Sequence, residues 1–137
     1  MSSFLLWPPS ATKSLAPKEQ IMVRYELTHT VPAHKTIDFD KEDFRYGFSR
    51  PKGGVFELPK SGWYNIVVIL NSSTGFFHAE VKKNGSMIMK MTNGRYETAT
   101  ANIIVYCSQG NTISVHTENE RMTGFGYWNN IYIRLLY

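Results

Sequence analysis

Short runs in which apolar and polar residues alternate, each ending at turn-forming residues, make up the chain from residue 23 onward. In the run from 77 to 82, apolar residues at odd positions alternate with polar residues at even positions. Asn84-Gly85 follows directly, and this pair favours the positive φ angles of a two-residue hairpin turn. We find no ten-residue segment with the 3.6-residue period of an amphipathic helix. The pattern therefore predicts an all-β sandwich or barrel.

The individual strands are predicted from the same alternation, and an aromatic content of 14% fits their half-buried surfaces. Segment 63–70 is almost wholly apolar, so we expect a central strand that is buried on both faces. The hairpin partner of 77–82 is expected to carry Met87, Met89 and Met91 on one side. The predicted strands are 23–27, 63–70, 77–82, 99–107, 112–117 and 131–137.

The prolines divide the chain of 137 residues into an arm and one domain. Three of the six prolines lie in the first 17 residues, so residues 1–22 are expected to form an extended arm and residues 23–137 a single domain. The apolar tip of the arm is expected to pack either on its own domain or on a neighbouring subunit.

Because Cys107 is the only cysteine, it cannot form an internal disulfide, and we expect a buried thiol.

Charge and the first residues exclude two classes of partner. The net charge is +4, but the 15 Lys and Arg residues are scattered, and Lys82-Lys83 is the only adjacent pair. Nucleic-acid binding requires a basic patch or stripe, so it is not expected. The opening MSSFLLWPPS has no basic residue before a short apolar run. This opening predicts neither a signal peptide nor membrane insertion, and it leaves the compartment unknown.

Catalytic and metal sites have little support in the sequence. The chain has no G-x-S-x-G motif, no local signature around Cys107 and no close same-face spacing of its four histidines, so we expect no enzyme and no cofactor. The acidic run from 38 to 43 offers oxygen ligands, and Asp38, Asp40 and Asp43 are the calcium candidates. The run lacks the glycine and the twelve-residue spacing of a known calcium loop.

Several short motifs, in order, resemble the globular heads of complement C1q and tumour necrosis factor. Phe56-Glu-Leu-Pro-Lys-Ser-Gly62-Trp-Tyr64-Asn-Ile66 is similar to the C1q signature of an aromatic residue, five residues, glycine, one residue and tyrosine. Ile37-Asp-Phe39-Asp40, Lys83-Asn84-Gly85 and the closing Leu135-Leu136-Tyr137 also resemble segments of that family. The resemblance covers residues 23–137. It implies a ten-strand jelly roll that forms a homotrimer and acts by binding, on a cell exterior or on the surface of a virion or particle.

Two functions are compatible with this resemblance. The first is a trimeric recognition module for a receptor, a surface glycan or a protein ligand, in which linked sites gain avidity. The second is a structural jelly-roll subunit of a virion, fibre or other particle. Aromatic side chains gain contact area at a low entropic cost, so the glycine-rich loop near residue 124 is a candidate ligand site. Its candidate residues are Arg121, Phe125, Tyr127 and Trp128.

The trimer contact is predicted from the two faces of three strands that a jelly roll places in one sheet. One face is uniformly apolar and is assigned to the core: Tyr64, Ile66, Val68, Ala101, Ile103, Val105, Ile131, Ile133 and Leu135. The opposite face mixes large apolar with polar groups, as subunit interfaces do. Burial there would require a carboxylate or carbonyl acceptor near Arg134. The predicted interface consists of Trp63, Asn65, Val67, Asn102, Ile104, Tyr106, Tyr132, Arg134 and Leu136.

Overall fold

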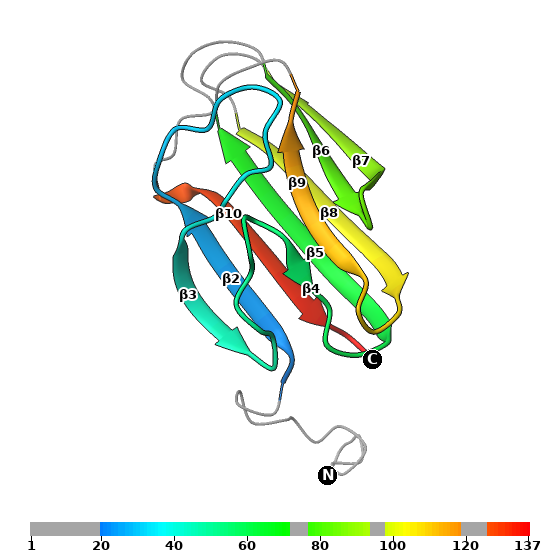
Figure 1. Ribbon diagram of the computed structural model, residues 1–137. Helices are drawn as coiled ribbons and strands as arrows, with labels where there is room; N and C mark the ends of the chain where they lie inside the picture. Colours follow the sequence, from blue (N-terminus) through cyan, green and yellow to red (C-terminus); the bar gives the residue numbers. More distant parts are fainter. Residues whose placement is uncertain (1–19, 72–76, 94–97, 119–125) are drawn as a thin grey trace, which may run out of the picture.

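A computed structural model describes residues 20–71, 77–93, 98–118 and 126–137, which form nine strands in two antiparallel sheets (Figure 1). The five-stranded sheet has the order β3-β2-β10-β5-β8, and the four-stranded sheet has the order β4-β9-β6-β7. The predicted all-β sandwich is thus confirmed. The strands are β2 (Met22–Leu27), β3 (Lys41–Tyr46), β4 (Phe56–Glu57), β5 (Gly62–Asn71), β6 (Phe77–Lys83), β7 (Ser86–Asn93), β8 (Thr98–Cys107), β9 (Thr112–Thr117) and β10 (Gly126–Leu135).

The core lies between the two sheets and is filled by alternate residues of each strand. Every second residue of β5 from Tyr64 to Leu70 is fully buried, and so are Ile113 and Val115 of β9. Within the predicted core face, Ile103, Val105 and Leu135 are half-buried and pack against this cluster. Cys107 is buried as a free thiol, as predicted. Burial of the side chain raises the pKa of Cys107, which disfavours the reactive thiolate.

The β6–β7 hairpin turns at Asn84 and Gly85, which both have positive φ angles, 53° and 81°. The predicted hairpin is therefore confirmed. A bulge between Val81 and Lys82 changes the register, so that Met87 pairs with the outward-facing Lys82. The expectation of three methionines on one side is wrong for this reason: Met91 is buried, whereas Met87 is 52% exposed.

A crossover of residues 28–40 connects β2 to β3 and runs along the β9 edge of the four-stranded sheet. On the way, Ile37 N donates to Val115 O and Thr117 N donates to Lys35 O, each at 2.8 Å. The crossover therefore extends the β9 edge before it returns to the five-stranded sheet. Within the described ranges, no helix has the length and apolar character that a membrane span requires.

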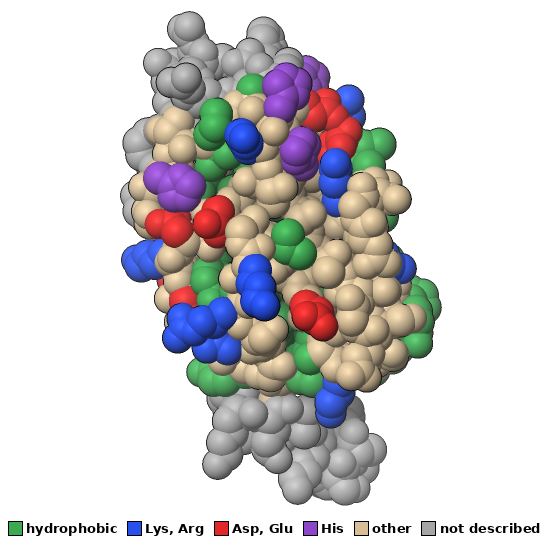
Figure 2. Space-filling view, in the orientation of Figure 1, with side chains coloured by type: hydrophobic (Ala, Val, Ile, Leu, Met, Phe, Trp, Pro, Cys, Tyr) green, Lys and Arg blue, Asp and Glu red, His purple; other side chains and the backbone are tan. Residues whose placement is uncertain are grey.

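The outer face of the four-stranded sheet is polar and charged. Figure 2 looks onto this side of the molecule, where histidine, lysine and acidic side chains gather at the upper end. The register places Glu80 of β6 between His116 of β9 and Lys90 of β7. Lys82 lies 3.7 Å from Glu80, and Lys90 lies 3.4 Å from Glu118. Opposite charges are thus paired at this end of the face.

Candidate functional site

The nine residues of the predicted interface lie together on the outer face of the five-stranded sheet. Strands β10, β5 and β8 are neighbours in that sheet, so their outward positions form continuous cross-strand rows. Leu136 N donates to Trp63 O at 2.7 Å, which extends the register beyond the end of β10. The rows are Tyr132–Val67–Asn102, Arg134–Asn65–Ile104 and, near the chain end, Leu136–Trp63–Tyr106.

Large apolar side chains on this face are in contact with water. Ile104 is 63% exposed, Tyr106 46% and Trp63 42%. The rings of Trp63 and Tyr106 meet edge to face with centroids 5.7 Å apart. β5 is an interior strand, as expected, but the expectation that it is buried on both faces is wrong for the single chain. Among its outward residues, Trp63 is exposed, whereas Asn65, Val67 and Ile69 are partly buried.

Two aromatic residues that sequence reasoning missed extend the same face onto β3. The ring of Phe44 stacks on Tyr46 at 5.9 Å and meets Tyr132 edge to face at 6.0 Å. The signal was present as the alternation Phe44-Arg45-Tyr46. The acidic residues that precede it favoured an ion-binding interpretation, so no strand was predicted there.

The polar groups of this face differ in how they are satisfied. Asn65 Nδ2 donates to Asn102 Oδ1 at 2.7 Å and to Ile103 O at 3.1 Å, so the two asparagines satisfy each other. Arg134 is exposed, and no hydrogen bond or ion pair between described residues involves its guanidinium. The acceptor that burial of Arg134 would require is therefore not supplied within the described part of its own chain.

A charged cluster lies within the same face on β2 and β3, where Arg24 is the cross-strand neighbour of both Tyr132 and Phe44. Arg24 pairs with Glu26 at 3.0 Å and also with Asp43, while Lys41 lies 3.7 Å from Glu26. A hydrogen bond from the Asp43 carboxyl lowers the pKa of Glu26. Burial and this shared proton raise the pKa of Asp43. The cluster satisfies its own charges and leaves no carboxylate for Arg134.

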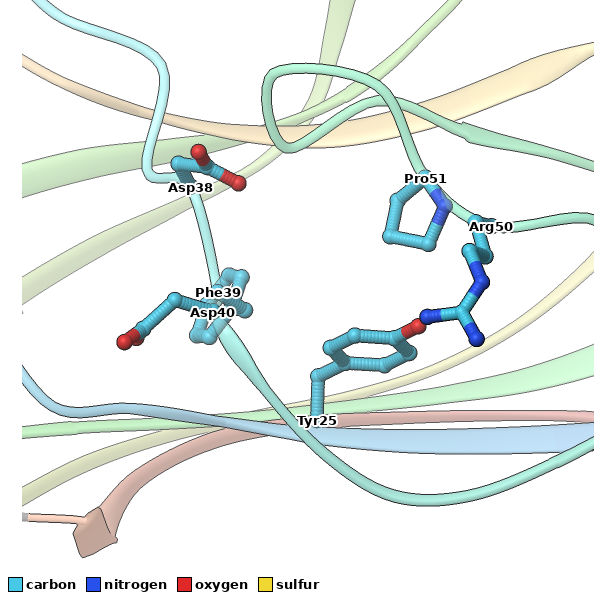
Figure 3. A pocket seen from close by; sticks show the side chains of 6 residues that line it. All are labelled: Tyr25, Asp38, Phe39, Asp40, Arg50 and Pro51. Carbon is cyan, nitrogen blue, oxygen red and sulfur yellow. The ribbon is translucent and has the colours of Figure 1, made fainter.

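The three calcium candidates do not converge. Asp43 takes Arg24 as its partner, whereas Asp40 accepts hydrogen bonds from the backbone and the hydroxyl of Thr28. Asp38 and Asp40 line one pocket, but the Asp40 carboxylate points away from it (Figure 3). Across residues 20–71, 77–93, 98–118 and 126–137, no three acidic, histidine or cysteine side chains are arranged to hold a metal ion.

The candidate ligand loop lies mostly outside the described residues. Arg121 and Phe125 fall in the undescribed segment 119–125, and only the backbone of Tyr127 is described. Trp128, in β10, is 47% exposed. The structure therefore places one exposed aromatic side chain at the start of β10.

A shallow pocket of about 240 Å³ lies beside the crossover (Figure 3). The Asp38 carboxylate points into it, Arg50 reaches toward it from the opposite side, and Asp40 points away. The Tyr25 hydroxyl donates to Glu42 Oε1 at 2.6 Å. Burial and this carboxylate raise the pKa of Tyr25 to about 12, so the phenol stays protonated. The pocket is lined by Tyr25, Asp38, Phe39, Asp40, Arg50 and Pro51.

The C1q-like signature has a structural role at the start of β5. Tyr64 is fully buried, as predicted, and its hydroxyl donates to Lys60 O at 2.6 Å. A Cβ at Gly62 would lie 2.8 Å from Tyr137 O and 2.6 Å from the Leu135 side chain. Glycine is thus required where the chain end crosses β5. The backbone of Trp63 holds that end by donating to Tyr137 O at 2.8 Å.

Comparison with known proteins gives matches at the level of structure. No protein-family model and no curated protein match the sequence. Eiger TNF from S. frugiperda superposes with a TM-score of 0.71 at 10% identity, over 86% of this chain and 93% of that one. Murine APRIL gives 0.67 at 12% identity, covering 86% and 100%. The globular domain of zebrafish complement 1qA gives 0.67 at 12%, covering 85% and 98%. The chain therefore has the jelly-roll fold of the tumour necrosis factor and complement C1q globular domains.

Proposed function

We propose that this protein is a non-enzymatic recognition module that assembles as a homotrimer through the outer face of its five-stranded sheet. One observation carries the proposal: Trp63, Ile104 and Tyr106 are large apolar side chains exposed side by side on an otherwise well-packed domain. Contiguous apolar patches of this kind mark interaction surfaces. The C1q-like fold supports this choice, because the sequence resemblance implies a trimer.

A second copy of the chain is the occupant that best fits this face. Aromatic anchors among a few polar groups are typical of subunit contacts. The Asn65–Asn102 pair is already satisfied, so covering it carries little penalty. Arg134 is the exception, because burying it without an acceptor is strongly unfavourable. The proposal therefore requires that a neighbouring copy supplies a carboxylate or carbonyl to Arg134.

The ligand is proposed to be a receptor, a surface glycan or another protein. Assembly of three copies would present three equivalent sites, and linked weak sites gain avidity. Trp128 is our candidate contact, because it is 47% exposed and borders the glycine-rich segment. A catalytic role is not proposed: the cysteine is buried, and its pKa is raised rather than lowered.

Light scattering coupled to size-exclusion chromatography tests the assembly. We expect a discrete species with three times the 15.7 kDa mass of the chain, unchanged over a tenfold range of concentration. A stable monomer would contradict the proposal. Open-ended growth would support the structural subunit of a particle or fibre instead. Once the trimer is established, a glycan and cell-surface binding screen would identify the ligand class.

A further inference from the structure

The crossover between β2 and β3 is closed at its neck by side-chain hydrogen bonds. Thr28 N donates to Asp40 Oδ1 at 2.8 Å, and the Thr28 hydroxyl donates to the other oxygen of the same carboxylate. The two ends of the crossover are thereby held together where the chain leaves β2 and approaches β3. Hydrogen bonding by Thr28 keeps the pKa of Asp40 below its ordinary value, although burial acts in the opposite direction. This part of the neck stays closed at neutral pH.

His29 makes a second closure of a different kind. Its Nε2 lies 3.0 Å from Asp38 O, and its Nδ1 lies 3.2 Å from Thr30 O. Both partners are backbone carbonyls, which only accept hydrogen bonds. A neutral imidazole has a single N–H and can satisfy one of them, whereas an imidazolium satisfies both. The geometry at both ring nitrogens therefore matches the protonated side chain.

The charges around the ring favour the same state. His29 Nε2 lies 3.7 Å from Asp40 Oδ1, and the charge of Asp38 also acts on the ring. These two carboxylates are the charged groups that act on His29 within the described chain. Burial, the largest single effect, lowers the pKa of His29, but the two carbonyls and the two carboxylates together raise the pKa above its ordinary value.

We propose that His29 is an acid-strengthened clasp: in its protonated form it holds Asp38 O and Thr30 O at once and fixes the neck of the crossover. When the ring loses its proton, one of the two hydrogen bonds is lost, and only the Thr28–Asp40 closure remains. The clasp is complete below the ordinary histidine pKa of about 6.5, and it weakens as the pH rises through the higher pKa of His29 in the folded protein.

The clasp controls one wall of the pocket beside the crossover. Asp38, Phe39 and Asp40 form that wall, opposite Arg50 (Figure 3). Phe39 is buried and anchors the wall to the core, so release of His29 would loosen the flanking residue Asp38 first. The Asp38 carboxylate, which points into the pocket, would then lose its fixed position. The pocket is therefore expected to be better ordered at mildly acidic pH than at alkaline pH.

Nuclear magnetic resonance titration of the four imidazole rings tests the clasp in the full chain. We expect His29 to titrate above about 6.5 and above His116, and its midpoint to fall in Asp40→Asn. His116→Gln is the matched control, and it should leave the His29 midpoint unchanged. A His29 midpoint at or below 6.5, or one that Asp40→Asn does not lower, would overturn the proposal.

Hydrogen exchange provides the second readout. After correction for the intrinsic rate, amides 38–40 should exchange at least about threefold faster at pH 8 than at pH 5.5, because local opening becomes easier. His29→Gln keeps one donor but cannot titrate, so it should remove this difference without unfolding the domain. Equal protection at the two pH values in the unaltered chain would count against the clasp, whatever the state of assembly.

Discussion

The outer faces of the two sheets are built on the same alternation and both carry charged residues, but the face of the five-stranded sheet also carries paired aromatic rings. On the five-stranded sheet, Trp63, Ile104 and Tyr106 project outward, and the rings of Phe44 and Tyr132 meet. On the four-stranded sheet, the register instead aligns His116, Glu80 and Lys90 in one row. Both sheets present apolar residues to the same core. The inward side chains therefore stabilise the fold, and the outward side chains determine which molecules the domain can contact.

Ion pairs balance part of the charge on the outer face of the four-stranded sheet, which also exposes Met87 and brings the Glu80 and Glu118 carboxyls together. Lys82 and Lys90 each lie within 4 Å of a glutamate, and water can solvate the rest. The aromatic face has no comparable compensation, since exposed apolar area gains free energy when it is covered. We therefore expect the proposed assembly to use the outer face of the five-stranded sheet.

The alternation along β5 predicts that alanine substitutions at neighbouring residues lower the free energy of unfolding by very different amounts. Tyr64→Ala should lower the free energy of unfolding by about 3 to 5 kcal/mol, because it empties a fully buried site and removes the hydrogen bond to Lys60 O. Trp63→Ala, one residue away on the outer face, should cost the monomer below about 1 kcal/mol. Urea unfolding under monomeric conditions measures both. Similar costs for the two variants would contradict the assignment of faces.

Tyr132→Asp should disrupt the trimer. A central aromatic anchor contributes about 2 to 4 kcal/mol to an interface, and the substitution replaces it with a charged group between Val67 and Arg24. Subunit affinity should fall by roughly 30- to 700-fold. Size-exclusion chromatography with light scattering measures the change. A Tyr132→Asp protein that remains a trimer of unchanged stability would show that the assignment of this face is wrong.

The matched control lies on the outer face of the four-stranded sheet. Ser114 projects from β9 opposite Lys82, so Ser114→Asp introduces the same negative charge as Tyr132→Asp but places it beside a lysine. We expect the assembly state and the unfolding midpoint to stay as they are. If Ser114→Asp dissociated the trimer as Tyr132→Asp does, the four-stranded sheet would also belong to the interface.

The contribution of His116 to folding stability is expected to depend on pH in the opposite sense to that of His29. Burial, with Lys82 and His34, lowers the pKa of His116, so the fold prefers the neutral ring. A lowered folded pKa contributes stability above the unfolded value of about 6.5, and this is lost as the pH falls through the folded pKa. His116→Gln should therefore flatten the fall in the urea midpoint between pH 7 and pH 5. An unchanged slope would place His116 in solvent.

The sequence predicted the residues whose environment follows from alternation and turn chemistry. The hairpin at Asn84 and Gly85, the burial of Tyr64 and the sharing of one face by β5, β8 and β10 all follow from local patterns. These features depend on period-two geometry, which each strand carries by itself. Whether a second copy covers the shared face depends on another molecule, so no pattern within one chain decides it.

The features that sequence reasoning missed depend on contacts between distant segments. β3 (Lys41–Tyr46) begins with charged residues and pairs as an edge strand, so it lacks a clean apolar alternation. The two residues of β4 are too few to show any period. The clasp joins His29 to Asp38 through a crossover whose path is set by β9. Only the folded chain brings these groups together.

The smallest effect is expected from removing the arm, and it tests whether the arm covers the aromatic face. Deletion of residues 1–20 retains Ile21, whose carbonyl accepts a hydrogen bond from Leu135 N at 2.9 Å and whose side chain packs on the core. All nine described strands and the pairing of β2 with β10 are kept, so the melting temperature should stay nearly unchanged. Differential scanning calorimetry measures this, with a deletion through Tyr25 as the control that removes most of β2 and should unfold the domain.

The apolar arm residues Phe4 to Trp7 are the competing occupant of the face around Trp63. If they occupied it, the shortened protein would lose stability and expose apolar surface. An insoluble or unfolded protein would therefore assign this face to the arm rather than to a second copy.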